Sequence, residues 1–228
     1  MQLKKWSELP TYMKTKEVKK YYDIIKKRKF SLLFKRIFDV IASMIMLLIL
    51  SPIMVVLMIM IKIDSKGPVF FRQERVTQYG RIFRIFKFRS MVDDADSFGV
   101  QVTTVGDVRI TRVGAMLRKQ RIDELPQLIN ILIGDMTFVG TRPEVKKYVD
   151  SYSNEMYATL LLPAGLTSRT SIEYKDEDKL LEGAYDINKV YIEKVLPAKM
   201  KYNLKNVKQF SLFSDIMTML ATFFAVLK

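Results

Sequence analysis

The chain has 228 residues, a formal net charge of +14, and neither cysteine nor histidine. Its length suits one domain of ordinary size plus membrane elements. The missing residue types exclude disulfides, thiol nucleophiles, imidazole bases and almost any zinc site. Any chemistry must therefore use carboxylates, Lys, Arg, Tyr or hydroxyls, and a hard metal ion held by oxygen ligands stays open.

A net positive charge of this size fits nucleic acid, anionic lipid or a phosphorylated substrate. No helix-turn-helix, RRM, KH or zinc-finger pattern accompanies the charge, so we expect no nucleic acid partner. Because the chain also carries a long apolar stretch, anionic membrane lipid is the default explanation for most of the charge. The apolar stretch lies too deep in the chain, and is too long, for a secretory signal.

Residues 1–31 are polar and basic, and we expect them to form an N-terminal arm. Lysine and arginine outnumber acidic residues between Lys14 and Lys29. Apolar side chains recur there near helical spacing, at Val18, Tyr21, Tyr22, Ile25 and Phe30. The pattern predicts a basic amphipathic helix suited to an anionic leaflet. A solvated tail is the alternative, and the sequence favours neither.

Val40 to Ile61 contains no charged residue and would measure roughly 33 Å as a helix, about the thickness of a bilayer core. Pro52 near its midpoint favours a kink. Basic residues on both flanks argue against a simple crossing, because positive charge tends to stay on one side of the membrane. We therefore predict a membrane element over residues 32–66, with a re-entrant hairpin and a kinked span left open by these arguments.

After this element the pattern changes to that of a folded domain, which we place at residues 67–209. Residues 82–88 alternate between basic and apolar, as in a half-buried strand, and the apolar residues 69–71 supply its hairpin partner. Helices are predicted from Ile110 to Lys119 and from Asp123 to Ile133, where a glycine follows.

Residues 210–228 form a second, weaker apolar segment, interrupted by Asp215 and hydroxyl residues. It is long enough to lie in a membrane interface, and packing in the core is the alternative. The predicted fold class is α+β and mainly helical. It combines the membrane element, a small β-hairpin and interfacial amphipathic helices around one domain. The resemblance described below implies that the membrane element is a re-entrant helix-break-helix hairpin and that the domain is catalytic.

Charged and amide side chains are concentrated in one short stretch of this domain. Asp123 and Glu124 stand at a predicted helix start, where free N–H groups favour anions and where an acidic residue is ordinarily just a cap. The flanking Arg and Lys suit a phosphate, and a divalent metal would be the natural third party. The stretch contains Arg118, Lys119, Arg121, Asp123, Glu124, Gln127, Asn130, Asp135 and Arg142.

Several separated motifs resemble those of the monotopic phosphoglycosyl transferases, bacterial sugar transferases that prime glycan assembly on a polyprenol phosphate. The similarity covers about residues 33–145 and keeps the motif order. The motifs are Lys35-Arg36-Ile37-Phe38-Asp39, Ser51-Pro52, Gly67-Pro68-Val69-Phe70-Phe71-Arg72-Gln73-Glu74-Arg75, Phe86-Lys87-Phe88-Arg89-Ser90-Met91, Arg121-Ile122-Asp123-Glu124-Leu125-Pro126-Gln127-Leu128, Asn130-Ile131-Leu132, Gly134-Asp135-Met136, Phe138-Val139-Gly140 and Arg142-Pro143.

The resemblance implies a two-step mechanism. Asp123 would attack the β-phosphate of a UDP-sugar, release UMP and form a covalent bond to the sugar phosphate. A polyprenol phosphate, expected to be undecaprenyl phosphate, would then accept the sugar phosphate. Carboxylate nucleophiles form such covalent intermediates, which agrees with a chain lacking Cys and His. Glu124, together with Asp123, would bind Mg²⁺. The implied substrate-binding residues are Arg118, Arg142, Lys87, Arg89, Gln127, Asn130 and Asp135.

The resemblance also favours the re-entrant hairpin and the cytoplasmic face of a bacterial inner membrane, with anionic lipid as a partner and a homo-oligomer left open. For three of the implied substrate-binding residues a purely structural role is the alternative. Lys87 and Arg89 would then lie on the exposed face of a strand, and Asp135 would belong to a turn. Thr141 replaces the first proline of the family's Gly-Pro-Arg-Pro turn, and residues 163–168 read Pro-Ala-Gly-Leu-Thr-Ser instead of a Pro-Gly-Ile-Thr-Gly pattern. The identity of the sugar is therefore not transferable. Two rivals are a glycosyltransferase that releases UDP and a non-catalytic membrane adaptor.

Overall fold

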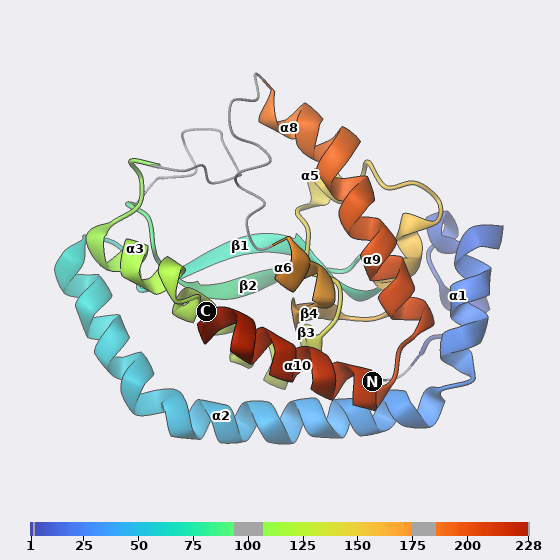
Figure 1. Cartoon of the computed structure of the whole chain (residues 1–228), viewed down its shortest axis with the longest axis horizontal. Helices are drawn as coiled ribbons and strands as arrows, with labels where there is room; N and C mark the ends of the chain where they lie inside the picture. The colour runs from blue at the N-terminus through green and yellow to red at the C-terminus, as the bar shows by residue number, and fades with distance from the viewer. Residues whose placement is uncertain (2, 94–106, 175–185, 228) are drawn as a thin grey trace.

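The computed structural model describes residues 1, 3–93, 107–174 and 186–227, which form a mainly helical fold with small two-stranded sheets (Figure 1). The helices are α1 (Lys16–Lys26), α2 (Lys29–Asp64), α3 (Arg112–Lys119), α4 (Gln127–Ile133), α5 (Lys146–Val149), α6 (Arg169–Glu173), α8 (Ile187–Val190), α9 (Leu196–Lys208) and α10 (Leu212–Leu227). The strands are β1 (Phe70–Val76), β2 (Ile82–Phe88), β3 (Met136–Val139) and β4 (Ala164–Thr167). Short 3-10 turns include η5 (Ile122–Glu124) and η6 (Met156–Leu161).

The apolar stretch lies inside α2, a helix of 36 residues that continues through Pro52. Figure 1 shows α2 running beneath the rest of the chain and then changing direction, as expected when a proline removes a backbone hydrogen bond. By length and composition, α2 is the one helix among the described residues that could cross a membrane. One bent helix thus stands where two separate half-helices were predicted, and the re-entrant path stays a prediction.

Three polar residues attach the first half of α2 to the domain. The buried Lys35 ammonium donates to Val139 O (2.9 Å) and pairs with Asp215 of α10 (2.5 Å). Arg36 donates to two carbonyls at the end of α4, and the Asp39 carboxylate accepts from the hydroxyl of Thr137 (2.7 Å). The charged residues of the Lys-Arg-Ile-Phe-Asp motif therefore hold the apolar helix to the domain.

The predicted β-hairpin is confirmed. β1 and β2 pair antiparallel in a register that places Arg75 opposite Phe83 and Phe71 opposite Lys87. Phe83 is buried with side chains of α4 and β3, so one face of the hairpin covers a hydrophobic core. The adjacent pair β3 and β4 is parallel.

The N-terminal arm contains the predicted amphipathic helix, α1. Its apolar face packs into the main hydrophobic core, where Val18 and Ile25 are fully buried. Figure 1 shows α1 beside α9 at one end of the molecule. The apolar face of this helix therefore contacts protein, and its lysines face outward.

The C-terminal segment forms α10, which lies alongside the first part of α2 in Figure 1. The outward-facing apolar side chains of α10 include Phe213, Leu220, Phe223 and Phe224, each at least 49% exposed. α2 carries a similar exposed row that includes Leu48 and Ile49. Together the two helices present an apolar surface of the kind that marks a membrane or protein contact.

Candidate active site

Four segments bring their charged side chains to one place. α3 carries Arg118 in its last turn, η5 carries Asp123 and Glu124, β2 carries Lys87, and the loop after β3 carries Arg142. α3 and η5 are neighbours in the chain, whereas Lys87 and Arg142 come from distant segments that the tertiary fold brings to them.

The turn between α3 and η5 presents the Asp123-Glu124 pair. Arg121 adopts a left-handed conformation (φ 54°), which is uncommon for a residue with a side chain and is found at turns and functional sites. The predicted helix from Asp123 is wrong at its start: Asp123 and Glu124 lie in the separate turn η5, and α4 begins only at Gln127. The predicted end is confirmed, because Gly134 closes α4 with φ 92°.

Glu124 is held between two cations. Its Oε1 accepts from Lys87 Nζ (2.9 Å) and Arg142 Nη2 (2.6 Å), and its Oε2 accepts from Arg142 Nη1 (2.9 Å). Burial alone would raise the pKa of Glu124, but the charges and hydrogen bonds of Arg142 and Lys87 lower it well below its usual value. Glu124 is therefore ionised at any pH near neutrality.

Asp123 has a different environment from its neighbour. Its side chain is buried, and no group in the described part of the chain donates a hydrogen bond to its carboxylate. Burial raises the pKa of Asp123, the Glu124 charge raises it further, and Lys87, Arg118 and Arg142 oppose the shift. A carboxylate with no hydrogen-bond donor keeps its lone pairs available, which suits a nucleophile or a metal ligand.

Backbone contacts fix the position of Arg142. Its Nη1 also donates to the carbonyl of Leu166 (2.5 Å). The chain segments that carry Arg142 and Leu166 approach each other closely, because a Cβ at Gly165 would lie 2.2 Å from the backbone nitrogen of Gly140. Sequence reasoning missed the role of Leu166. Its only signal was the small residue Gly165 beside the Pro-Ala-Gly-Leu-Thr-Ser departure.

The structure brings some predicted site residues together and separates others. Lys87, Arg118 and Arg142 surround the carboxylate pair. Asn130 instead binds the backbone of β2 through Phe86 N (2.8 Å) and Arg84 O (3.1 Å). The other three predicted residues make different contacts. Asp135 pairs with Arg81 (2.6 Å), and Arg89 binds the end of α2. Gln127 is fully buried, and its side chain has no hydrogen bond to any described residue.

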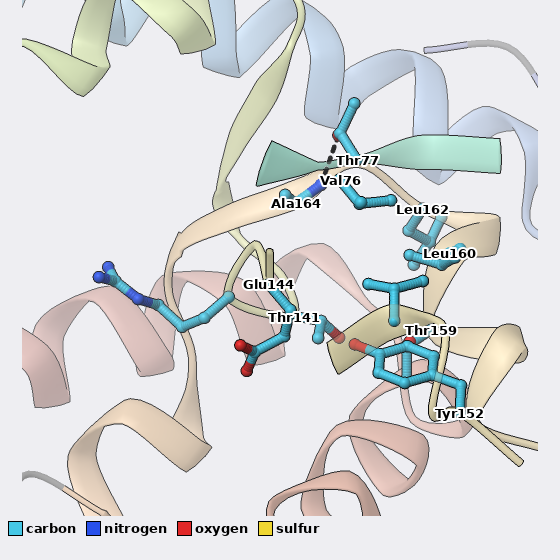
Figure 2. A pocket seen from close by; sticks show the side chains of 11 residues that line it. Val76, Thr77, Thr141, Glu144, Tyr152, Thr159, Leu160, Leu162 and Ala164 are labelled. Carbon is cyan, nitrogen blue, oxygen red and sulfur yellow. Dashed lines mark hydrogen bonds between the residues drawn. The ribbon is translucent and has the colours of Figure 1, made fainter. Parts of the chain in front are cut away.

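A second charged group lies directly beyond Arg142. The Glu144 carboxylate accepts from Tyr191 (2.7 Å) and lies 3.5 Å from Lys199 Nζ. Figure 2 shows Glu144, Thr141 and Tyr152 around a small pocket, with the Tyr152 hydroxyl directed toward Thr141. The replacement of proline by Thr141 thus adds a hydroxyl to the wall of this pocket.

Asp123 and Glu124 could also hold a metal ion. Within the described ranges, no group of three or more acidic side chains forms a ready-made metal site. Mg²⁺ commonly uses one or two carboxylates together with waters and substrate phosphates. A carboxylate offers about four lone pairs. Lys87 and Arg142 donate to three of those on Glu124, so one lone pair on Oε2 accepts no hydrogen bond from the described residues. The donor set fits a hard cation.

The family model described as bacterial sugar transferase matches residues 30–228. The chain belongs to the bacterial sugar transferase family. This family member is 37% identical over 173 residues to the UDP-N-acetylgalactosamine-undecaprenyl-phosphate N-acetylgalactosaminephosphotransferase of Aeromonas hydrophila. It is also 34% identical over 176 residues to the UDP-glucose:undecaprenyl-phosphate glucose-1-phosphate transferase of Xanthomonas campestris pv. campestris.

These alignments cover 74% and 75% of this chain but only 38% and 34% of the two relatives. A putative undecaprenyl-phosphate N-acetylgalactosaminyl 1-phosphate transferase of Bacillus subtilis (strain 168) is 44% identical over 98 residues, 43% of this chain and 55% of the relative. The sugar transferase described here therefore spans a third to about half the length of these relatives. The names of the three relatives agree in the acceptor, undecaprenyl phosphate, whereas two of them name N-acetylgalactosamine and one names glucose as the sugar.

Proposed function

We propose that this protein transfers a sugar 1-phosphate from a UDP-sugar to a polyprenol phosphate, undecaprenyl phosphate in bacteria, and releases UMP. The observation that carries the proposal is the pair of unlike carboxylates: Glu124 is fixed between Lys87 and Arg142, and Asp123 is buried beside it without a hydrogen-bond donor among the described residues. Family membership and the names of the relatives support the substrate classes.

In the proposed first step, an Asp123 carboxylate oxygen attacks the β-phosphorus of the UDP-sugar. The bond from that phosphorus to the bridging oxygen breaks, and UMP leaves with the electron pair. The negative charge that develops on the transferring phosphoryl group lies near Lys87, Arg118 and Arg142, whose positive charges stabilise it. Glu124 keeps two of these cations in place.

In the second step, a phosphate oxygen of the polyprenol phosphate attacks the same phosphorus. The bond to Asp123 breaks, the carboxylate is restored, and polyprenol-diphosphate-sugar leaves. This transfer would be the first membrane step of exopolysaccharide, capsule, O-antigen or glycoprotein glycan synthesis. Mg²⁺ held by Glu124 and Asp123 would neutralise phosphate charge on the donor substrate.

The proposed location is the cytoplasmic face of the bacterial inner membrane. The exposed apolar surface of α2 and α10 supports membrane contact, and the outward lysines of α1 support attraction to anionic lipid. A site on a membrane surface is accessible both to a soluble nucleotide sugar and to a lipid-anchored acceptor.

Product analysis tests the proposal. The purified full chain is incubated in lipid nanodiscs with undecaprenyl phosphate, Mg²⁺ and each of a panel of UDP-sugars, and the released nucleotide is identified. UMP release with one sugar is expected. Release of UDP would instead indicate a glycosyltransferase that leaves the phosphate behind, and no turnover with any sugar would favour the membrane adaptor.

A further inference from the structure

The C-terminal end of α2 is bound on one side by Arg89. Its Nη2 donates to the backbone carbonyls of Ser65 (2.6 Å) and Ile61 (3.4 Å) and to the Ser65 hydroxyl (2.9 Å). Helix ends leave carbonyls without partners, and a charged donor satisfies them. Arg89 directly follows β2 and is only 5% exposed, so this contact joins the end of the apolar helix to the β-hairpin inside the protein.

The same helix end is bound on its other side by α3. The carboxylate of Asp64, the last residue of α2, accepts from Val113 N (2.9 Å) in the first turn of α3. The nitrogen of Thr111 donates to the carbonyl of Ser90 (3.1 Å), the residue after Arg89. A Cβ at Gly114 would lie 2.0 Å from that carbonyl oxygen, so α3 begins in direct backbone contact with the end of the hairpin.

These contacts form one connected unit, which we call the α2 junction and define as Asp64, Ser65, Arg89, Ser90, Thr111 and Val113. Two routes lead from it to the candidate site. Lys87, which binds Glu124, stands two residues before Arg89 in the chain. α3 starts at the junction, carries Arg118 in its last turn, and leads directly into the turn that presents Asp123.

We propose that Arg89 and Asp64 are positioning residues that set the Asp123-Glu124 pair and its cations relative to the end of the apolar helix. The proposal rests on the proposed function, in which the site must meet a lipid-borne acceptor at a defined height above the membrane. Because reacting groups must be placed to within about 1 Å, a small shift at the junction would be felt at the site.

The contacts of Arg89 favour this role over that of a substrate ligand. The nitrogen that makes its hydrogen bonds faces the end of α2, and its Nε and Nη1 are buried without a partner in the described part of the chain. A positioning residue and a phosphate ligand differ in kinetics: loss of the first lowers kcat, whereas loss of the second raises KM for the substrate that it binds.

The kinetic test compares Arg89→Gln and Asp64→Ala in the full chain in lipid nanodiscs. Each should lower kcat for UMP release about tenfold or more, with KM for both substrates within about twofold. Asp64→Asn keeps an acceptor for Val113 N and should restore most of kcat. Arg84→Gln is the matched control, because Arg84 is exposed on the same strand and its guanidinium pairs, within the described ranges, with the exposed Glu74 (3.6 Å).

Hydrogen exchange of the same samples gives a readout that does not need turnover. Both variants should increase exchange in peptides covering Arg118 to Leu125, whereas Arg84→Gln should not. Unchanged exchange there, or a raised KM with unchanged kcat in Arg89→Gln, would overturn the inference. If the wild type releases no UMP, the proposed function fails while the exchange result still decides the role of the junction.

Discussion

Arg142 binds Glu124 at two points, with Nη1 2.9 Å from Oε2 and Nη2 2.6 Å from Oε1. The planar guanidinium matches the two carboxylate oxygens, an arrangement that lysine does not reproduce. The same Nη1 donates to Leu166 O, so one side chain ties the turn η5 to the end of β4. Glu124 in turn holds Lys87, so two of the three cations near Asp123 depend on one carboxylate.

Arg142→Lys tests this dependence. The variant keeps a positive charge but loses the two-point geometry and the bond to Leu166. Because charge-assisted hydrogen bonds contribute about 1.5–3 kcal/mol, kcat/KM for UMP release should fall by about tenfold to a hundredfold. Arg84→Lys, at an exposed position of β2, serves as the control and should keep wild-type activity. Wild-type kcat/KM in Arg142→Lys would show that charge alone is sufficient.

The pH dependence of the reaction should report on Asp123. Burial raises the pKa of this carboxyl, and the charge of Lys87 is the main influence that opposes the shift. Since the attacking carboxylate must be ionised, kcat/KM should rise with pH through a pKa above that of an ordinary aspartate. Lys87→Gln removes the opposing charge, so the acid limb should move to higher pH.

The control for this shift is Lys119→Gln, an exposed position at the end of α3. Its profile should coincide with that of the wild type. An acid limb that stays in place, or moves to lower pH, in Lys87→Gln would mean that a group other than Asp123 controls the reaction on the acid side. The measurement is a pH series of initial rates at low substrate concentration.

Thermal unfolding tests the position of the N-terminal arm. Ile25 is fully buried in the main hydrophobic core, so Ile25→Ala should lower the free energy of unfolding by about 2–5 kcal/mol. Lys20→Ala changes an exposed position on the same helix and should leave Tm nearly unchanged. Equal Tm values for the two variants would indicate that the arm does not contribute to the folded domain.

The family resemblance, rather than spacing, implied Lys87 and Arg142 as substrate-binding residues, and that role stays a prediction. The structure places both within hydrogen-bond distance of Glu124. Asn130 and Asp135 belong to the same stretch, yet their side chains bind β2 and Arg81. Spacing along the chain cannot tell a polar side chain that faces a ligand from one that satisfies the backbone of a neighbouring strand.

Some elements of the fold could likewise be predicted from local sequence patterns, and others could not. Local patterns were enough for the β-hairpin, for α3 and for the glycine that ends α4. The burial of α1 could not be predicted, because an amphipathic helix has the same pattern whether it covers a protein core or a membrane. The turn that separates η5 from α3 depends on the left-handed Arg121, and no residue type that favours this conformation stands there.

The most direct measurement is peptide mass spectrometry of the protein after incubation with its UDP-sugar and no acceptor. We expect a sugar phosphate on the peptide that contains Asp123, and neither this adduct nor UMP release in Asp123→Asn. At neutral pH the ionised Asp123 opposes folding, because its raised folded-state pKa favours the folded protein only at lower pH. The Asn variant should therefore keep or raise Tm, which makes a folding defect distinguishable. Wild-type UMP release by Asp123→Asn, or an adduct on another residue, would contradict the account.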